Sequence, residues 1–362
     1  RAAQHMTNGL GHLPGAADAP VDGARSPAAR PVGYSVVICT RDRAATLSDV
    51  LVDLAGLHVP ADVAWEVVVC DNGSSDHTPA VAAAHAARLP LRLVRTEPLG
   101  VSHARNAGVA AARGRWILFL DDDVRVPPGW LAAWDDALRA HPGVAYAGGR
   151  IDALFEGRAD PVVRVGFDPL RNYWSILPIE GDEPAPGTHH FPYAANMALR
   201  RDWALRFPFD EGIGYRPGEI PSPGEETDVM LRMRGAGATG IWVPEARVQH
   251  RLGRARLNTP WLCARLRGSA LESVRLGLRR GRGVVLRVPL HVWYDVARFG
   301  ASAVGAALTL RPSLAVARLA LTYQRAWTAR FAFRGIGVAA TEPRPVTAPP
   351  IGASLQTEGV PR

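Results

Sequence analysis

The chain has very little cysteine and no lysine. Its 362 residues include three cysteines, Cys39, Cys70 and Cys263, and all 42 of its basic residues are arginine. Three cysteines cannot form a disulfide framework, and no Cys-x-x-Cys pair or histidine-rich spacing indicates a zinc site. The scarcity of cysteine therefore favours a reducing, cytosolic compartment.

Long apolar runs are missing too. Within residues 251–334 the longest uncharged run has 12 residues, from Phe299 to Leu310, whereas a membrane-spanning helix needs about 20. The N-terminus contains Asp18, Asp22 and several prolines in place of the apolar core of a signal peptide. The sequence thus predicts no transmembrane helix and no export.

Several nucleotide and nucleic-acid motifs are also absent. No Gly-x-Gly-x-x-Gly accompanies a predicted strand and no Gly-x-x-x-x-Gly-Lys-Ser/Thr occurs. The sequence therefore lacks the main signatures of dinucleotide-binding proteins and of P-loop proteins. Zinc-finger, RRM and basic-zipper patterns are missing as well. We therefore expect no nucleic-acid partner.

The chain does contain enough apolar residues to build a large core. Hydrophobic residues make up 47% of it, and its length allows two domains or one large domain with extensions. Residues 1–33 and 339–362 are rich in alanine, glycine and proline without apolar periodicity, which predicts disorder. We place an ordered domain at 34–255 and a basic helical region at 256–338.

Short apolar runs alternate with helix-like segments at the start of the ordered domain. The predicted strands are 34–39, 65–70, 91–94 and 116–120, and the predicted helices are 47–57, 79–88 and 102–113. Strands that are apolar on both faces belong to parallel sheets covered by helices, and right-handed crossovers make such a sheet doubly wound. We predict an α/β fold with a mostly parallel central sheet and a C-terminal α-helical extension.

Polar clusters follow three of these strands. They are Thr40–Asp42, Asp71–Gly73 and Asp121–Asp123. Ligands of open parallel sheets bind beyond the carboxyl ends of the strands, so the clusters are expected to meet at one edge. The alternative is that each cluster only makes a turn or caps the next helix.

The triplet Asp121–Asp123 indicates a metal site. Three adjacent carboxylates repel one another, and a bound divalent cation would relieve that repulsion. Oxygen ligands select Mg²⁺ or Mn²⁺, which often complete their coordination with substrate phosphates. A solvated acidic turn is the alternative.

Five motifs, in this order, resemble those of family 2 glycosyltransferases. They are YSVVICTRDRAATL, VVVCDNGSSDHT, GVSHARNAGVAAARGRWILFLDDDV, YAANMALRR and GEETDVMLRMRGAG, and they lie within 34–251. The resemblance implies a GT-A fold, a nucleotide-diphospho-sugar donor, a divalent cation, a saccharide or lipid-linked acceptor, and inversion at the anomeric carbon.

The resemblance also implies roles for residues on the donor side. Thr40, Arg41 and Asp42 would line the nucleotide pocket. Asp71 would contact the base, and Arg105 would lie near the nucleotide.

The acidic triplet corresponds to the DXD motif of that family. Asp121 would lie toward the ribose and the metal, Asp122 in the nucleotide-sugar site, and Asp123 on the metal. His250 would reach the metal or the diphosphate, and Asn196 would lie on the acceptor side.

The motif GEETDV would hold the catalytic base. Many relatives have Glu-Asp where this chain has Glu225 and Glu226. We assign the base to Glu226, with Glu225 as the alternative and Asp228 as a supporting carboxylate. A start-of-helix position favours the ionised form of such a carboxylate, although both glutamates could simply stabilise the helix.

Aromatic and histidine residues occur in the irregular segment 155–192. Tyr173, Trp174, His189 and His190 could stack on or contact a sugar there. Aromatic residues of such a segment also commonly fill core.

The C-terminal region is strongly basic. Residues 251–334 contain 16 arginines and only two acidic residues, Glu272 and Asp295, and apolar residues recur at helical spacing from Pro260 to Phe333. Arginine-rich helices with Trp, Phe and Leu fit peripheral contact with an anionic membrane. The alternative is ordinary packing of these helices on the domain.

Together these observations predict an inverting, metal-dependent glycosyltransferase for cell-envelope polysaccharide or glycolipid. It would be cytoplasmic or lie at the inner face of the cell membrane. The competing hypothesis is a non-catalytic, GT-A-like nucleotide-binding or scaffold protein.

Overall fold

The structure is a computed structural model that describes residues 33–179, 191–218, 223–277, 284–286 and 288–334. The segments predicted to be disordered, 1–33 and 339–362, lie outside this part of the chain except for Gly33. His189 and His190 also lie outside it.

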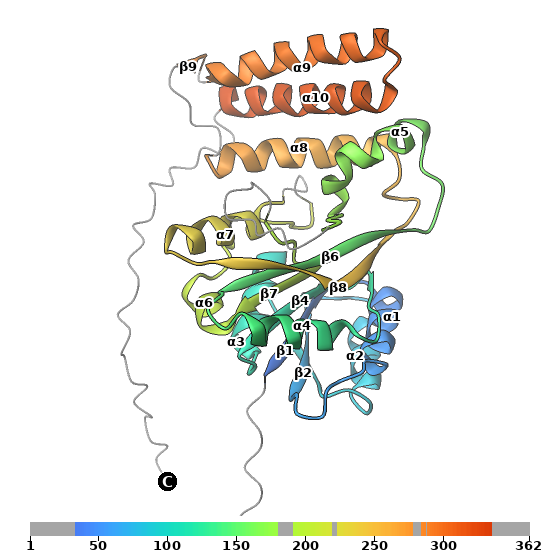
Figure 1. The fold of residues 1–362 in the computed structure, drawn as a ribbon, viewed down its shortest axis with the longest axis vertical. Coiled ribbons are helices and arrows are strands. Elements are labelled where there is room, and N and C mark those ends of the chain that lie inside the picture. The colour runs from blue at the N-terminus through green and yellow to red at the C-terminus, as the bar shows by residue number, and fades with distance from the viewer. Residues whose placement is uncertain (1–32, 180–190, 219–222, 278–283, 287, 335–362) are drawn as a thin grey trace, which may run out of the picture. The chain divides into compact units, whose positions relative to one another are not determined.

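The first half of the sheet has the predicted elements. Its strands are β1 (Tyr34–Thr40), β2 (Trp65–Asp71), β3 (Leu91–Arg95) and β4 (Trp116–Asp121), all paired in parallel. The helices between them are α1 (Ala44–Ala55), α2 (Thr78–His85) and α3 (Val101–Ala111). The predicted doubly wound start of the fold is therefore confirmed (Figure 1).

Four further strands extend the sheet, in the order β3-β2-β1-β4-β7-β6-β8-β5. They are β5 (Val124–Arg125), β6 (Tyr146–Phe155), β7 (Asn196–Arg200) and β8 (Gly240–Leu252). β7 is antiparallel to both β4 and β6, β6 and β8 are parallel, and β5 is antiparallel to β8. The sheet is thus mostly parallel, as predicted, with antiparallel pairs in its second half.

Alternate residues of the inner strands enter two different cores. Val36 and Ile38 of β1 pack with α1 and with α4 (Trp130–Ala140), whereas Val37 packs on the opposite face. That second core also contains side chains of α3, α6 (Arg201–Arg206) and α7 (Glu225–Gly235). Burial on both faces explains why the interior of these strands is mostly apolar. Two buried polar side chains are the exceptions, and Ser35 of β1 donates a hydrogen bond to Glu66 of β2 at 2.7 Å.

The C-terminal region is helical, as predicted. Its helices are α8 (Thr259–Arg275), α9 (Leu290–Leu308) and α10 (Pro312–Arg334), with the short strands β9 (Val284–Val285) and β10 (Val288–Pro289) before α9. Asn258 caps α8 by accepting a hydrogen bond from the backbone N–H of Trp261 at 3.0 Å. Among the described helices, none has the length and apolar character to cross a membrane.

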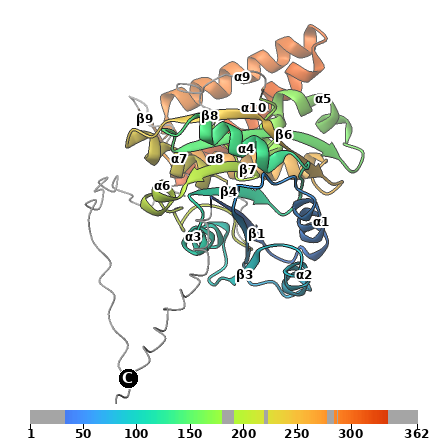
Figure 2. The ribbon, with the colours of Figure 1, turned by 60° about the horizontal axis from the view of Figure 1, so that its bottom comes forward.

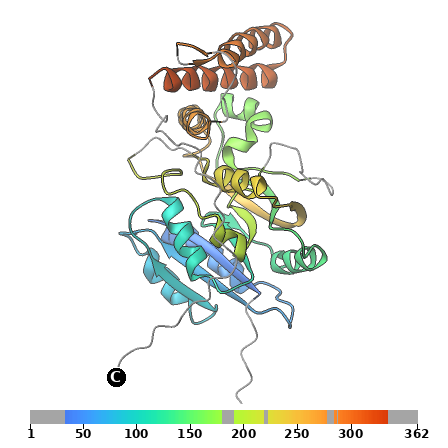
Figure 3. The ribbon, with the colours of Figure 1, turned by 90° about the vertical axis from the view of Figure 1, so that its left-hand side faces the viewer.

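These helices are stacked on the domain in layers. α10 packs between α8 and α9 and also contacts α5 (Pro161–Leu170), which leads into the 3₁₀ helix η1 (Arg171–Trp174). Figures 1 and 3 show α8 beside the sheet and α9 farther out, on the other side of α10. Figure 2 shows α9 crossing above β8 and β6. α8 is therefore the helix of this region that lies nearest the sheet (Figures 1 and 3).

Candidate active site

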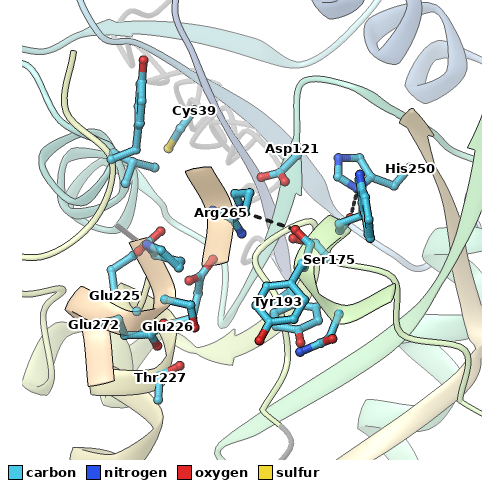
Figure 4. Close-up of a pocket in the computed structure, with 18 of the residues that line it drawn as sticks. Cys39, Asp121, Ser175, Tyr193, Glu225, Glu226, Thr227, His250, Arg265 and Glu272 are labelled. Atoms are coloured by element: carbon cyan, nitrogen blue, oxygen red, sulfur yellow. Dashed lines mark hydrogen bonds between the residues drawn. The ribbon is translucent and has the colours of Figure 1, made fainter. Parts of the chain in front are cut away.

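A cavity of about 910 Å³ lies beyond the carboxyl ends of β1 and β4. Its walls also include the first turns of α3 and α7, His250 of β8, and side chains of α8 and α10. This is the edge at which an open parallel sheet binds ligands. Figure 4 shows Asp121 and His250 on one side of the cavity and Glu225, Glu226 and Glu272 on the other.

The acidic triplet occupies the end of β4 and is largely buried. Thr40 donates a hydrogen bond from Oγ1 to Asp122 Oδ2 at 2.7 Å. Asp123 Oδ2 accepts hydrogen bonds from Arg43 at 2.9 Å and from Arg256 at 2.6 Å. The triplet is thus held by groups from two distant parts of the chain, the end of β1 and the segment after β8, and it is not a solvated acidic turn.

The three carboxyl groups differ in acidity. Burial, followed by the charge of Asp123, raises the pKa of Asp121. Burial also raises the pKa of Asp122 to about 7. Burial opposes ionisation of Asp123 as well, but His250, Arg256 and Arg43 hold its pKa well below its usual range. Asp123 is therefore the permanent anion of the triplet.

Asp121, Asp123 and His250 could hold a cation. Each offers one ligand atom, and these atoms lie within 4.8 Å of one another. His250 Nδ1 lies 2.8 Å from the carbonyl oxygen of Trp174, which can only accept, so Nδ1 carries the proton and Nε2 points toward Asp123 Oδ1 at 3.2 Å. Two carboxylates and one imidazole suit Mg²⁺ or Mn²⁺, so these residues fit the predicted metal.

Glu225 and Glu226 begin α7 and share one arginine. Arg105 donates to Glu225 Oε1 at 2.5 Å, and its other terminal nitrogen lies 3.1 Å from Glu226 Oε1. Burial and the charge of Glu226 raise the pKa of Glu225 to about 7 despite Arg105. Within the described structure Glu225 Oε2 is buried without a hydrogen-bond partner. Arg105, expected near the nucleotide, thus lies in the cavity as the counter-ion of these carboxylates.

Glu272 of α8 is a third glutamate of this cluster, and the sequence did not indicate it. The side chain of Glu272 lies against Gly224, where an added Cβ would be 2.6 Å from Glu272 Cγ. Burial, followed by the charges of Glu225 and Glu226, raises the pKa of Glu272 to about 7. One signal could have found it, because Glu272 is one of two acidic residues in the strongly basic segment 251–334.

The α8 side of the cavity also carries polar and aromatic groups. Arg265 Nε donates to the backbone oxygen of Tyr173 at 3.2 Å. Tyr173 donates from its hydroxyl to Gln324 Oε1 of α10 at 3.1 Å. Trp174 stacks on Trp261 with ring centroids 5.4 Å apart. Tyr173 and Trp174 both line the cavity and also pack with the C-terminal helices. Their positions are therefore compatible both with contact to a sugar and with a role in the core.

Of four residues predicted on the donor side, two line the cavity and two do not. Thr40 and Arg41 line the cavity, but Asp42 is not among the described lining residues and instead accepts from the backbone N–H of Ser75 at 2.7 Å. Asp71 is fully buried and accepts from the backbone N–H of Ser74 at 3.0 Å. The next residue, Asn72, lines the cavity in its place.

Asn196, predicted on the acceptor side, and Asp228, predicted to support the base, are not among the described residues that line the cavity. Asn196 is fully buried, where it accepts from Trp130 and donates to the backbone oxygens of Arg150 and Ala246. Its amide therefore joins β7 to β6, β8 and α4. Asp228 pairs with Arg232 one turn along α7 at 2.6 Å and is not among the described lining residues.

Comparisons with known proteins agree with this geometry. Residues 35–206 match the model of the family described as glycosyl transferase family 2. The chain is 29% identical over 249 residues to the succinoglycan biosynthesis protein ExoM of Rhizobium meliloti, which covers 68% of this chain and 76% of ExoM. It is 32% identical over 224 residues to the pre-mycofactocin glycosyltransferase of Mycobacterium tuberculosis, 60% of this chain but only 42% of that protein.

The fold is also similar to that of a solved enzyme. The mannosyltransferase PcManGT from Pyrobaculum calidifontis, solved in complex with GDP-Man and Mn²⁺, superposes with a TM-score of 0.55 and 21% identity. The match covers 86% of this chain and 90% of that one. The predicted GT-A fold is thus confirmed.

Proposed function

Since residues 35–206 belong to glycosyl transferase family 2, we propose that the protein transfers a sugar from a nucleotide-diphospho-sugar to an acceptor hydroxyl with inversion at the anomeric carbon. One observation carries this proposal. The acidic end of β4 and the Glu225–Glu226 pair face each other across a single cavity. The charges of Arg105 and Glu226 both act on Asp121, so the two groups are electrostatically linked.

The β4 side of the cavity is assigned to the donor. Thr40, Arg41 and Asn72 would contact the nucleotide, with Asp122 fixed by Thr40. Asp121, Asp123 and His250 would hold a divalent cation, Mg²⁺ or Mn²⁺, which supplies positive charge for the departing diphosphate when bound.

Two arginines add positive charge on the donor side. The guanidinium groups of Arg43 and Arg256 lie against Asp123 at 2.9 and 2.6 Å, and both residues line the cavity. They would attract the donor diphosphate, since arginine binds phosphate oxygens well.

The α7 side is assigned to the acceptor. Glu226 would remove the proton of the acceptor hydroxyl while the new bond to the anomeric carbon forms and the bond to the β-phosphate oxygen breaks. The side chain of Glu226 is 16% exposed and that of Glu225 is 7% exposed. Glu225 also holds the shorter contact with Arg105, which supports Glu226 as the base and Glu225 as the alternative.

The acceptor is proposed to be a saccharide or a lipid-linked saccharide of the cell envelope. The polar and aromatic lining of the α8 side suits a sugar, and ExoM is named for succinoglycan biosynthesis. The enzyme would work in the cytoplasm, in peripheral contact with the inner face of the membrane. The scaffold hypothesis is less well supported, because the buried carboxylates and their arginine partners are all present.

The test is a panel of nucleotide-sugars with Mn²⁺ or Mg²⁺, scored by release of nucleoside diphosphate. Asp123→Ala should abolish release, whereas Asp62→Ala, which removes an exposed carboxylate paired with Arg139, should not. Equal release by the wild type and Asp123→Ala would contradict the donor site. Binding of a nucleoside diphosphate without turnover of any donor would favour the scaffold hypothesis.

A further inference from the structure

Helix α9 carries a continuous apolar face that is exposed. Its inner face buries Val292, Phe299 and Ala306. The outer face follows the helical repeat, three or four residues apart, and consists of Leu290, Trp293, Tyr294, Ala297, Ala301, Val304 and Leu308. We call these seven residues the α9 face.

The exposure of the α9 face is large for apolar side chains. The exposed fractions are 49% for Leu290, 42% for Trp293, 66% for Tyr294, 61% for Val304 and 79% for Leu308. Leu310, just beyond the helix, is 89% exposed, and Leu286, just before it, is 65% exposed. The helix has 19 residues, so the stripe is about 28 Å long at about 1.5 Å per residue. A contiguous apolar surface of this kind marks an interaction site.

Charge borders this face but does not interrupt it. Asp295 of α9 lies on the inner side, where it pairs with Arg325 of α10 at 3.2 Å. Arg298 lies at the edge of the α9 face, over the ring of Tyr294 at 5.8 Å. Arg311 follows the helix and is exposed. The whole segment 251–334 has 16 arginines against two acidic residues.

We infer that the α9 face lies flat on an anionic bilayer, with its apolar side chains at the level of the acyl chains and the bordering arginines against lipid phosphates. An apolar helix face flanked by arginine, with Trp and Tyr among its residues, is the pattern of an in-plane membrane helix. Arg298 and Asp295 lie in the middle of α9, which fits a helix on the surface and not across the bilayer. This inference deepens the membrane contact proposed above by naming the surface that makes it.

A second copy of the chain is a poorer occupant. Two copies meeting through α9 would bring together two regions that each carry a large positive charge, and like charges repel at an interface. An anionic lipid surface instead complements both the charge and the apolar stripe.

The experiment is co-sedimentation of the full chain with vesicles of phosphatidylcholine, alone or mixed with phosphatidylglycerol, at low and high salt. Leu290→Glu and Leu308→Glu should each weaken binding to the mixed vesicles about tenfold or more, because each replaces apolar area that the bilayer would bury with a charge. Val52→Glu is the matched control, since Val52 is an aliphatic side chain of helix α1 that is 56% exposed. It should bind like the wild type.

A second readout uses Trp293. Brominated lipids should quench part of the tryptophan emission of the bound wild type, and Trp293→Phe should bind the vesicles but lose that part. Unchanged binding of Leu290→Glu and Leu308→Glu, or unchanged quenching of Trp293→Phe, would overturn the assignment of this face. Self-association without vesicle binding would identify a second copy as the occupant.

The result is separable from the glycosyltransferase proposal. All of these variants lie outside the cavity, so each should keep the thermal shift produced by nucleoside diphosphate with Mn²⁺. If a variant of the α9 face loses vesicle binding and keeps that thermal shift, the loss reports on the α9 face alone. Loss of the shift in the wild type would count against the transferase and leave the α9 face untouched.

Discussion

Replacing Glu272 with glutamine should stabilise the protein at alkaline pH. Glu272 lines the cavity and is partly buried, and desolvation together with the charges of Glu225 and Glu226 raises its pKa from 4.5 to about 7. The native state therefore binds a proton at Glu272 in the range between those values, whereas the unfolded chain has released it. The free energy of unfolding consequently falls as pH rises through that range.

The size of the effect follows from the pKa. A rise from 4.5 to about 7 corresponds to roughly 3 kcal/mol that is present below pH 4.5 and lost above pH 7. Glutamine has a similar shape and no charge, so Glu272→Gln should match the wild type in acid and exceed it by up to that amount at pH 8. For a chain of this size that is several degrees, at about 2 °C per kcal/mol.

The assay is thermal and urea unfolding of both proteins at several pH values between 4.5 and 8.5. Glu245→Gln serves as the control, because it removes an exposed carboxylate of β8. If Glu272→Gln is instead less stable than the wild type at pH 8, then Glu272 is ionised and favourably paired. The view of α8 as contributing a protonated acid to the cavity would then be wrong.

Three further predictions concern the site. Nucleoside diphosphate should raise the melting temperature with Mn²⁺ but not with EDTA, since Asp121 and Asp123 alone would repel the diphosphate. Equal shifts in melting temperature under both conditions would refute the metal assignment. Glu226→Gln should keep donor binding while the rate of transfer falls by at least about 10². If Glu225→Gln is inactive and Glu226→Gln is active, the base is Glu225. Gly224→Ala should lower the free energy of unfolding in urea by about 1–3 kcal/mol, because the φ of Gly224 is +124° and an added Cβ would meet Glu272. Gly129→Ala is the control that should not show this loss, because nothing lies within 4 Å of its added Cβ.

The part of the fold that sequence could predict is the part with buried, mostly apolar strands. β1, β2 and β4 each contain a continuous apolar run, so each was visible in the sequence. β8 alternates buried and exposed positions and contains arginine and glutamate, so it resembles a polar segment until its partners are known. The antiparallel pairs in the second half of the sheet were missed for this reason.

The candidate site divides in a similar way. Asp121 and Asp123 could be found because they directly follow a strand. Their arginine partners could not, since Arg43 and Arg256 lie 80 and 133 residues from Asp123 in the sequence. The sequence also did not single out Asn72, which lines the cavity next to the buried Asp71, because neighbouring side chains at a strand end point to opposite faces.

The cavity is built from two consecutive stretches of the chain. The stretch that matches the family, 35–206, supplies the ends of β1 and β4 and the start of α3. Glu225, Glu226, Glu272 and Gln324 all come after it. An exchange of the later stretch between relatives would therefore change these groups together with His250 and Arg256, while leaving the ends of β1 and β4 intact. Such modularity would let an evolving lineage vary one wall of the cavity while it keeps the opposite wall.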